Sequence, residues 1–370
     1  MEDPKPANVA SGLGHQPAAS ACEADHQPQT QAAPMRDGPH QSSDEFDIVG
    51  AYHSKLADHD ITKPVAAIEA LVALLAVSHY TTVFETLETV KRHSLTLRAS
   101  VRNPTPLQAG TDLFLQYLVS SLKQQEAKTA APGGGTTYHQ SFEDVLRHLV
   151  LNSRLFADRA IAARDGIAEA GCRFVREGKT LLTLGASRSV AKLLFRAASR
   201  HRVDDVDFKV IYVRDDRRPD ESNRFVVSLR EKGIPVSEIS EWSVSHVMSL
   251  RNRVHMVFVG AEAVTQSGGI ISRIGTFQVA KLARESKPRL PFYVAAETHK
   301  FVRKFPLGQA DLGYDQTVLD FQSTKPGTMP EHTVDYTPPE YVTNLITENG
   351  VKLPSYVLEQ LLDIYGALNG

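Results

Sequence analysis

Two spacings of apolar residues divide this chain of 370 residues. Up to about Arg176, apolar residues recur every three or four positions, which is typical of amphipathic helices. Pro64 suits the first turn of one such helix, because an N–H at that position has no partner within the helix. The apolar residues of this helix follow at i, i+3, i+4 and i+7: Ile68, Leu71, Val72 and Leu75. We expect this face of the helix to lie in a core.

Three further helices are predicted in the first half of the chain. Thr82 stands three residues before Glu85, which is the spacing of a capping box. A second helix is expected to follow Gly110. Its apolar stripe consists of Leu113, Phe114, Tyr117 and Leu118. A third helix runs from Ser141 to about Arg176 and is expected to bridge two domains.

Two stretches lack any such pattern. Residues 1–44 are rich in Pro, Gln, Ser, Ala and Gly and contain no aromatic residue, so they bury too little apolar surface to offset the entropy of ordering. We expect a disordered tail there, with order beginning at Phe46. Residues 126–140 contain one proline followed by three glycines and predict a flexible surface loop.

Beyond Gly178, short apolar runs alternate with helical segments, which is typical of βαβ units in a parallel sheet. The expected strands are Thr180–Leu184, Phe208–Val213, Val254–Val259 and Phe292–Ala296. The expected helices are Val190–Ser199, Phe225–Lys232 and Gly275–Glu285. The predicted class is therefore α/β, with a helical N-terminal domain at residues 45–176 and a parallel-sheet C-terminal domain at residues 177–370.

Composition limits the classes of partner. The 41 basic and 43 acidic residues nearly balance, so no general attraction to nucleic acid or to anionic lipid is expected. The most apolar window, Val65 to Val77, is far shorter than the roughly 20 residues that cross a bilayer, and the start of the chain lacks the pattern of a secretory signal. Only two cysteines occur, with no spacing that suggests zinc. We expect a cytosolic protein without a metal or cofactor.

The first candidate site follows the first predicted strand, at Gly185, Ser187 and Arg188. A helix that begins there presents free N–H groups, which favour an anion. The spacing matches neither GxGxxG nor a P-loop, so a dinucleotide or a P-loop nucleotide is poorly supported. Two alternatives remain, a ligand cradle and a glycine that only allows a tight turn.

The second candidate site follows the third predicted strand. Glu262 stands at the end of this strand, and a glycine-rich segment from Ser267 to Thr276 contains Arg273 before the next helix. An acidic and a basic group in this arrangement are suited to the hydroxyls and the phosphate of a sugar phosphate. The alternative is a Glu262–Arg273 ion pair that stabilises the loop.

From Phe46 onward, the sequence resembles the regulatory α, β and δ subunits of eukaryotic translation initiation factor 2B, which are related to methylthioribose-1-phosphate and ribose-1,5-bisphosphate isomerases. The resemblance rests on these segments: Val259–Glu262, Gly268–Ile271, Ile274–Thr276, Phe292–Val294, Lys300–Arg303, Phe305–Pro306, Val334–Pro339 and Leu345–Gly350. The short region before Phe46 and the early end of the chain resemble the α type most. The resemblance implies a Rossmann-like C-terminal domain.

The resemblance also implies that the chemistry of the isomerases is absent. In those relatives, a cysteine and an aspartate transfer the proton, and the two positions correspond to Gly185 and Glu262 here. Glycine offers no acid or base, and glutamate displaces the carboxylate by one methylene. Cys172 is expected to be a small core residue. The alternative is an active aldose–ketose isomerase that uses Glu262 as a base and a water in place of the thiol.

Loss of the proton relay does not remove the pocket. Arg218 matches an Arg-Pro motif of the family, and Arg273 stands where the isomerases carry a lysine that binds substrate. We expect a sugar phosphate or a nucleotide monophosphate to be held by ten residues: Gln108, Gly110, Thr111, Gly185, Ser187, Arg188, Arg218, Glu262, Ser272 and Arg273. The alternative is that these residues only stabilise the fold, with Arg217 and Arg218 on a solvated loop.

The resemblance implies a non-catalytic regulatory subunit of the guanine-nucleotide exchange factor for initiation factor 2. Such a subunit forms a homodimer, joins the β and δ subunits and, through them, the catalytic γ and ε subunits of a decamer. Its helical domain helps to recognise initiation factor 2 phosphorylated on its α subunit, and so inhibits exchange during stress. Five basic residues are candidates for that contact, although each is more readily explained as a solvated surface charge: Lys55, Lys63, His79, Lys91 and Arg92.

Overall fold

The structure is a computed structural model, and it describes residues 46–58, 61–78, 80, 82–129, 142–200, 206–316, 318–319, 321 and 332–366. The tail predicted at residues 1–44 and the predicted contact residue His79 lie outside this range. From Phe46 onward the chain forms one compact unit. No helix within the described residues is long and apolar enough to cross a membrane.

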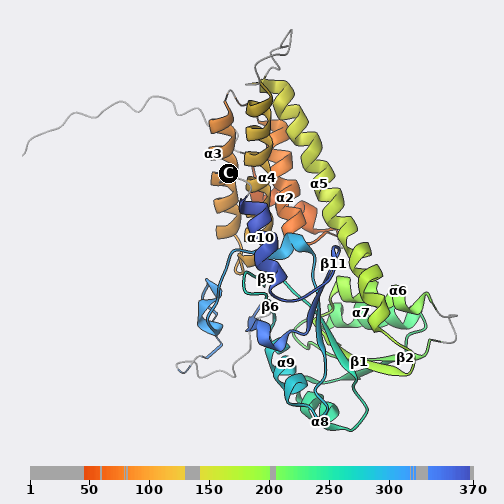
Figure 1. The fold of residues 1–370 in the computed structure, drawn as a ribbon. Helices are drawn as coiled ribbons and strands as arrows, with labels where there is room; N and C mark the ends of the chain where they lie inside the picture. Colours follow the sequence, from red (N-terminus) through yellow and green to blue (C-terminus); the bar gives the residue numbers. More distant parts are fainter. Residues whose placement is uncertain are drawn as a thin grey trace, which may run out of the picture. The chain divides into compact units, whose positions relative to one another are not determined.

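The first half of the unit is helical (Figure 1). Its helices are α1 (Ile48–Leu56), α2 (Lys63–Val77), α3 (Val83–Ala99), α4 (Thr105–Thr129) and α5 (Phe142–Gly171). Helix α2 is central, because it contacts each of the other four. Pro64 lies in its first turn and its predicted stripe is buried, as expected. Alanines outside the stripe are buried too, so more than one face of α2 lies in the core.

Helix α3 begins as predicted, since the Thr82 hydroxyl accepts a hydrogen bond from the N–H of Glu85 at 3.1 Å. The predicted start of α4 is wrong, because this helix begins at Thr105 and contains Gly110 in its interior. The side chain of Asn103 accepts the N–H of Thr105 at 3.1 Å and so starts the helix earlier. Gly110 has a packing role instead: a Cβ there would lie 2.5 Å from the carbonyl oxygen of Pro64 on α2.

The end of α4 and the extent of α5 also differ from prediction. Helix α4 continues to Thr129, so residues 126–129 are helical and do not belong to the predicted loop, whose remainder lies outside the described residues. Helix α5 ends at Gly171, and a 3₁₀ turn, η1 (Cys172–Phe174), follows. Helix α5 contacts α2 in the helical part and α6 in the α/β part.

The second half contains a seven-stranded sheet with the order β11-β10-β7-β4-β1-β2-β3. Its strands are β1 (Lys179–Leu184), β2 (Phe208–Val213), β3 (Val236–Ile239), β4 (Met256–Gly260), β7 (Phe292–Ala295), β10 (Asn344–Thr347) and β11 (Gly350–Lys352). All neighbours pair in parallel except β10 and β11. The four predicted strands are therefore present, and the predicted α/β class is confirmed.

Helices cover both faces of this sheet (Figure 1). They are α6 (Arg188–Ala198), α7 (Pro219–Glu231), α8 (Val244–Ser249), α9 (Thr276–Glu285) and α10 (Tyr356–Gly366). On β1, Leu181 packs in the core with α6, α7 and the end of α5, whereas Leu182 packs in the core with α8, α9 and α10. Successive strand residues point to opposite faces, which explains the continuous apolar runs. Cys172 is a fully buried core residue, as expected.

A smaller sheet was not predicted. It has the order β8-β5-β6-β9 and consists of β5 (Ala263–Thr265), β6 (Ile270–Arg273), β8 (Phe301–Val302) and β9 (Val334–Thr337). The glycine-rich segment from Ser267 to Thr276 therefore contains a strand, with Gly268 and Gly269 in the turn of the β5–β6 hairpin and Gly275 directly before α9. Strands of two to four residues are too short to show a period of two in the sequence. Short 3₁₀ turns complete the fold: η2 (Glu241–Ser243), η3 (Thr298–Lys300), η4 (Gln309–Leu312) and η5 (Pro339–Tyr341).

Candidate functional site

The order of the strands defines where a ligand can bind. From β1 the chain proceeds through β2 to β3 on one side, and it then returns to place β4 on the other side of β1. Such a reversal leaves a crevice at the carboxyl ends of the two central strands, which is the usual ligand site of an open α/β sheet. Gly185 follows β1 and Glu262 follows β4, so both lie at this edge of the sheet.

The turn after β1 is left-handed. Gly185 has a φ of +78° and Ala186 a φ of +46°. Glycine adopts this conformation without steric cost, so the tight-turn role considered for Gly185 is present. Ser187 caps α6 by accepting the N–H of Val190 at 3.4 Å. Arg188 donates from Nη1 to the carbonyl oxygen of Ile61 at 2.9 Å, and so joins the sheet edge to the helical part.

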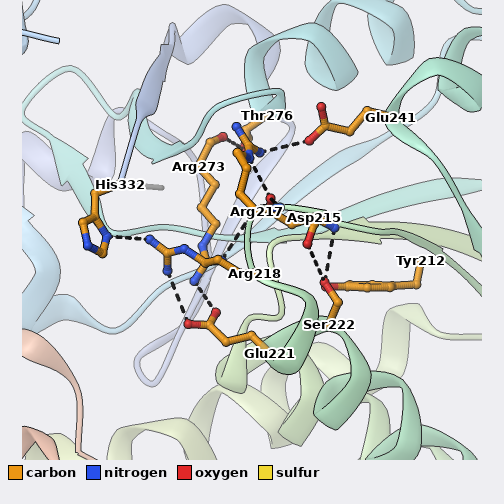
Figure 2. Close-up of polar contacts among 10 residues, drawn as sticks. All are labelled: Tyr212, Asp215, Arg217, Arg218, Glu221, Ser222, Glu241, Arg273, Thr276 and His332. Carbon is orange, nitrogen blue, oxygen red and sulfur yellow. Dashed lines mark hydrogen bonds and ion pairs between the residues drawn. The ribbon is translucent and has the colours of Figure 1, made fainter. Parts of the chain in front are cut away.

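Arg218 and Arg273 come together around a carboxylate (Figure 2). Arg273 Nη2 donates to Glu221 Oε2 at 2.6 Å, and Arg218 Nη1 donates to Glu221 Oε1 at 3.4 Å. Arg218 Nη2 also lies 2.7 Å from His332 Nδ1, and Arg273 Nη1 lies 3.5 Å from Asp215 Oδ2. Arg218 is buried, with only 8% of its surface exposed. This burial contradicts the alternative in which Arg218 lies on a solvated loop.

A second layer of contacts supports this cluster. Arg217 Nε donates to Asp215 Oδ1 at 2.7 Å, and its Nη2 donates to Glu241 Oε1 at 2.9 Å (Figure 2). The hydroxyl of Ser222 donates to the carbonyl oxygen of Asp215 at 3.4 Å and accepts the N–H of the same residue at 3.2 Å. These bonds hold the loop after β2 against the start of α7, so the guanidinium groups are positioned by fixed backbone.

Glu262 has partners other than the predicted one. Its Oε2 accepts from Asn103 Nδ2 at 3.0 Å and lies 4.0 Å from Lys63 Nζ. The alternative of a Glu262–Arg273 pair is therefore wrong, since both charges are engaged elsewhere. Burial, and to a smaller extent the charge of Glu262, raises the pKa of Tyr52 to about 12. The same two effects raise the pKa of Tyr314. Glu262 thus faces aromatic and polar side chains of the helical part and of the segment near η4.

The remaining predicted residues fall into two groups. Ser272 lies at the sheet edge, where its hydroxyl donates to the carbonyl oxygen of Gly260 at 3.0 Å. In contrast, Gln108, Gly110 and Thr111 lie on α4. The Thr111 hydroxyl is buried and accepts from Arg98 Nε at 2.9 Å, while Gly110 packs against α2. The contacts of Gly110 and Thr111 therefore lie within the helical part, where they hold its helices together.

Four residues of the site were not predicted: Asp215, Glu221, His332 and Asn103. Glu221 was detectable, because it stands three residues after Arg218 in the first turn of a helix that starts with proline. Asn103 precedes a proline, which is also a signal for a helix start. His332 had no sequence signal. Within the described residues, no three His, Cys, Asp or Glu side chains are grouped as metal ligands.

Comparison with known proteins identifies the family. The model of the "Initiation factor 2 subunit family" matches residues 58–354 of the chain. The chain belongs to this family. Relatives in the family include the protein named translation initiation factor eIF2B subunit alpha of Dictyostelium discoideum, with 35% identity over 61% of this chain and 71% of the relative. The protein of the same name in Caenorhabditis elegans is 29% identical over 86% of this chain and 98% of the relative.

The initiation factor 2 subunit family also contains enzymes. The ribose 1,5-bisphosphate isomerase of Archaeoglobus fulgidus is 29% identical over 58% of this chain and 67% of the enzyme. Among solved structures, the β subunit of eIF2B from Chaetomium thermophilum matches with a TM-score of 0.64 at 19% identity, over 86% of this chain and 90% of that chain. A tetrameric β₂δ₂ complex of eIF2B from the same organism matches equally well, over 86% of this chain and 93% of the matched chain. These structures establish the fold.

A buried ionic cluster lies beside the candidate pocket, at the carboxyl end of β7. Glu297 is fully buried, with Lys300 Nζ 2.7 Å from its Oε2 and Arg164 Nε 3.5 Å from its Oε1. Ser189, in the first turn of α6, donates to Glu297 Oε1 at 2.8 Å. Burial alone would raise the pKa of Glu297, but Lys300 and the other charges outweigh it and hold this pKa well below its ordinary value. Burial lowers the pKa of the neighbouring His299 to about 4.

Proposed function

We propose that this chain is a non-catalytic regulatory subunit, of the α type, of the guanine-nucleotide exchange factor for translation initiation factor 2. Membership of the family and the coverage of nearly the whole Caenorhabditis elegans α subunit support this assignment. The observation that carries the non-catalytic part is Gly185. It occupies the position that we assign to the cysteine of the isomerases and takes a left-handed turn with a φ of +78°.

The geometry around Glu262 also argues against catalysis. Enolisation of a sugar phosphate needs two positioned groups, an acid and a base. Gly185 offers neither, and the Glu262 carboxylate is held by Asn103 at 3.0 Å. A residue that replaced Gly185 would place its Cβ 3.5 Å from Cδ of Arg273, and it would adopt a backbone conformation that favours glycine.

We propose that the subunit acts within a cytosolic complex. In this assignment it forms a homodimer and joins β and δ subunits and, through them, the γ and ε subunits, which carry out exchange. The matching β₂δ₂ complex from Chaetomium thermophilum supports complex formation between members of this fold. The helical part, about Phe46 to Gln124, would contact initiation factor 2 phosphorylated on its α subunit.

The basic residues proposed for that contact differ in their surroundings. Lys91 and Arg92 are exposed on α3. Lys55 pairs with Glu69 at 3.1 Å, and Lys63 faces Glu262 at 4.0 Å. Lys91 and Arg92 are adjacent and both exposed, so together they can present two positive charges to a phosphate on a partner, and we prefer them for the phosphoserine contact on that ground.

A retained pocket for a sugar phosphate or a nucleotide monophosphate belongs to the same proposal. Arg218 and Arg273 converge on one carboxylate at the carboxyl end of the sheet, and paired guanidinium groups also suit the oxygens of a phosphate. Gly185 and Ser187 lie at the same edge. No metal or other cofactor is required for this role.

Purification of the endogenous complex, followed by native mass determination, tests the assignment. We expect a decamer with two copies of this chain, together with β and δ subunits. Recovery of the chain as a free metabolic enzyme would overturn the proposal. The subunits that copurify also distinguish an α-type chain, which pairs with itself, from a β or δ type.

A second candidate function is an active aldose–ketose isomerase, favoured by the presence of ribose 1,5-bisphosphate isomerases among the relatives. In this case Glu262 would act as the base and a water would replace the missing thiol. The test is incubation of the purified chain with ribose 1,5-bisphosphate or methylthioribose 1-phosphate and detection of the ketose. We expect no ketose, and turnover of either substrate would reject the non-catalytic assignment.

A further inference from the structure

Glu221 occupies the space between the two arginines that are expected to bind phosphate. Each of its carboxylate oxygens accepts from a different guanidinium group, Oε2 from Arg273 at 2.6 Å and Oε1 from Arg218 at 3.4 Å (Figure 2). Two guanidinium groups that hold two oxygens of one anion are the arrangement by which arginines recognise phosphate. The protein's own carboxylate therefore satisfies the arginines in this structure.

The electrostatics of the position favour an anion. Burial alone would raise the pKa of Glu221, but Arg273 and Arg218 outweigh burial and hold this pKa below its ordinary value. Glu221 also lies in the first turn of α7 (Pro219–Glu231), where the helix dipole favours negative charge. The same field acts on any anion that takes the place of the carboxylate, including the phosphate of a ligand.

Glu221 is the most exposed of the three charged side chains that meet here, so it has the most room to turn outward. Its side chain is 37% exposed, compared with 8% for Arg218 and 18% for Arg273. Each arginine has a second partner that does not depend on Glu221, because Arg218 contacts His332 at 2.7 Å and Arg273 lies 3.5 Å from Asp215. If Glu221 turned toward solvent, both guanidinium groups would stay in place with their donors exposed to a ligand.

We propose that Glu221 is an internal competitor for the phosphate of the ligand. The carboxylate and the phosphate share one place between Arg218 and Arg273, and binding requires Glu221 to turn outward. This inference rests on the phosphate pocket of the proposed function, and it adds a way in which ligand binding to that pocket is regulated. The net free energy of ligand binding is only the difference between the ligand's contacts with the arginines and those of Glu221. The site therefore responds to high concentrations of a phosphorylated sugar. It also discriminates against singly charged carboxylates, which bind the arginines more weakly.

Titration calorimetry with ribose 5-phosphate tests this inference, with free ribose as the ligand that lacks phosphate. The variants are Glu221→Gln, which keeps the size of the side chain, and Glu221→Ala, which removes its polar group. Glu231→Gln, at the exposed end of the same helix, is the matched control for loss of one charge. Arg273→Gln removes one of the two donors. Thermal unfolding of each variant verifies that it is folded.

We expect both Glu221 variants to bind ribose 5-phosphate about tenfold more tightly than the wild type, which corresponds to about 1.4 kcal/mol. The Glu231 variant should bind as the wild type does, the Arg273 variant should lose at least tenfold, and free ribose should bind to none of them. Equal affinity of the wild type and the Glu221 variants, with loss in the Arg273 variant, would overturn the competitor role but keep the pocket. Failure of every protein to bind ribose 5-phosphate, or wild-type affinity in the Arg273 variant, would overturn the pocket and the competitor role together.

Discussion

At the residue scale, Glu297 illustrates how a charge is retained in the core. The carboxylate is fully buried beside Lys300, Arg164 and the hydroxyl of Ser189. These partners come from α5, from α6 and from the turn after β7, so the charge connects three elements. A buried charge is tolerated only when it is paired, because the desolvation of an unpaired ion costs several kcal/mol. Removal of the carboxylate therefore deprives two buried cations of this partner.

We expect Glu297→Gln to lower the free energy of unfolding by about 3 kcal/mol, the scale for breaking a buried ion pair. Urea unfolding followed by circular dichroism measures this change. Glu231→Gln, at an exposed position, is the control and should have little effect. The double variant Glu297→Gln/Lys300→Met should recover part of the loss. An unchanged midpoint in the single variant would contradict the role of the ionic cluster.

At Asp335, unlike at Glu297, the effect of burial on the pKa outweighs the effect of the surrounding partners. It lies on β9, is 8% exposed, and caps α9 from a distance by accepting the N–H groups of Gly275 at 2.8 Å and of Phe277 at 3.0 Å. Burial raises its pKa from 3.8 to about 7, and these two N–H donors together with Arg217 offset only part of the increase. The folded protein thus prefers the protonated form of this acid more strongly than the unfolded chain does.

This raised pKa predicts a dependence of stability on pH. The contribution of Asp335 is fully present below pH 3.8 and is lost as the pH rises toward and through about 7. Asparagine keeps an oxygen that accepts the two N–H groups, but it carries no charge. The melting temperature of Asp335→Asn, relative to the wild type, should therefore rise between pH 4 and pH 8. A difference that stays constant across this range would contradict the raised pKa.

At the scale of the elements, the contact between α2 and α4 determines how the helical part packs. The glycine at position 110 suggested the start of a helix, but it lies in the interior of α4, where it lets the two helices approach closely. A Cβ at Gly110 would lie 2.5 Å from the oxygen and 2.9 Å from the Cα of Pro64. Both atoms belong to the backbone, so a larger residue must displace a whole helix. The sequence shows the glycine but not the neighbour that requires it.

Gly110→Ala should consequently destabilise the protein, although alanine favours a helix by about 1 kcal/mol over glycine. Overpacking against backbone costs about 1–3 kcal/mol, and the site has no flexible side chain that can give way. Thermal unfolding should show a lower melting temperature. Gly308→Ala is the control, because a Cβ there meets no atom within 4 Å. A melting temperature at or above that of the wild type would contradict the close packing of α2 and α4.

At the scale of the whole molecule, contacts join the helical part to the α/β part. Asn103 donates to Glu262, Arg188 donates to the carbonyl oxygen of Ile61, and Lys304 Nζ donates to Thr105 Oγ1 at 3.1 Å. Helix α5 packs against α2 and also against α6. Near residue 176, where the sequence predicts a domain boundary, the secondary structure changes from helical to α/β, and both parts belong to the unit that extends from Phe46.

We expect this unit to unfold in a single cooperative transition. Calorimetry of the purified chain should give equal calorimetric and van't Hoff enthalpies, which is the test of two-state behaviour. Ala substitution of Asn103 should shift the one transition to lower temperature without splitting it. Two separate transitions would show that the predicted domains at residues 45–176 and 177–370 are energetically independent.

Local patterns in the sequence were sufficient for the α/β class, the central strands and the first turns of α2 and α3, because periodicity and capping depend on residues within a few positions of one another. The family motifs placed Arg218 and Arg273 in one pocket, and the two residues do meet, but Arg273 ends β6, an antiparallel strand of the smaller sheet that was not predicted. What these arginines contact follows only from how the elements pack in space. Glu221 lies 52 residues from Arg273 in the sequence, and His332 lies 114 residues from Arg218. The partner of a charge depends on which element ends meet in space, and no local spacing encodes that.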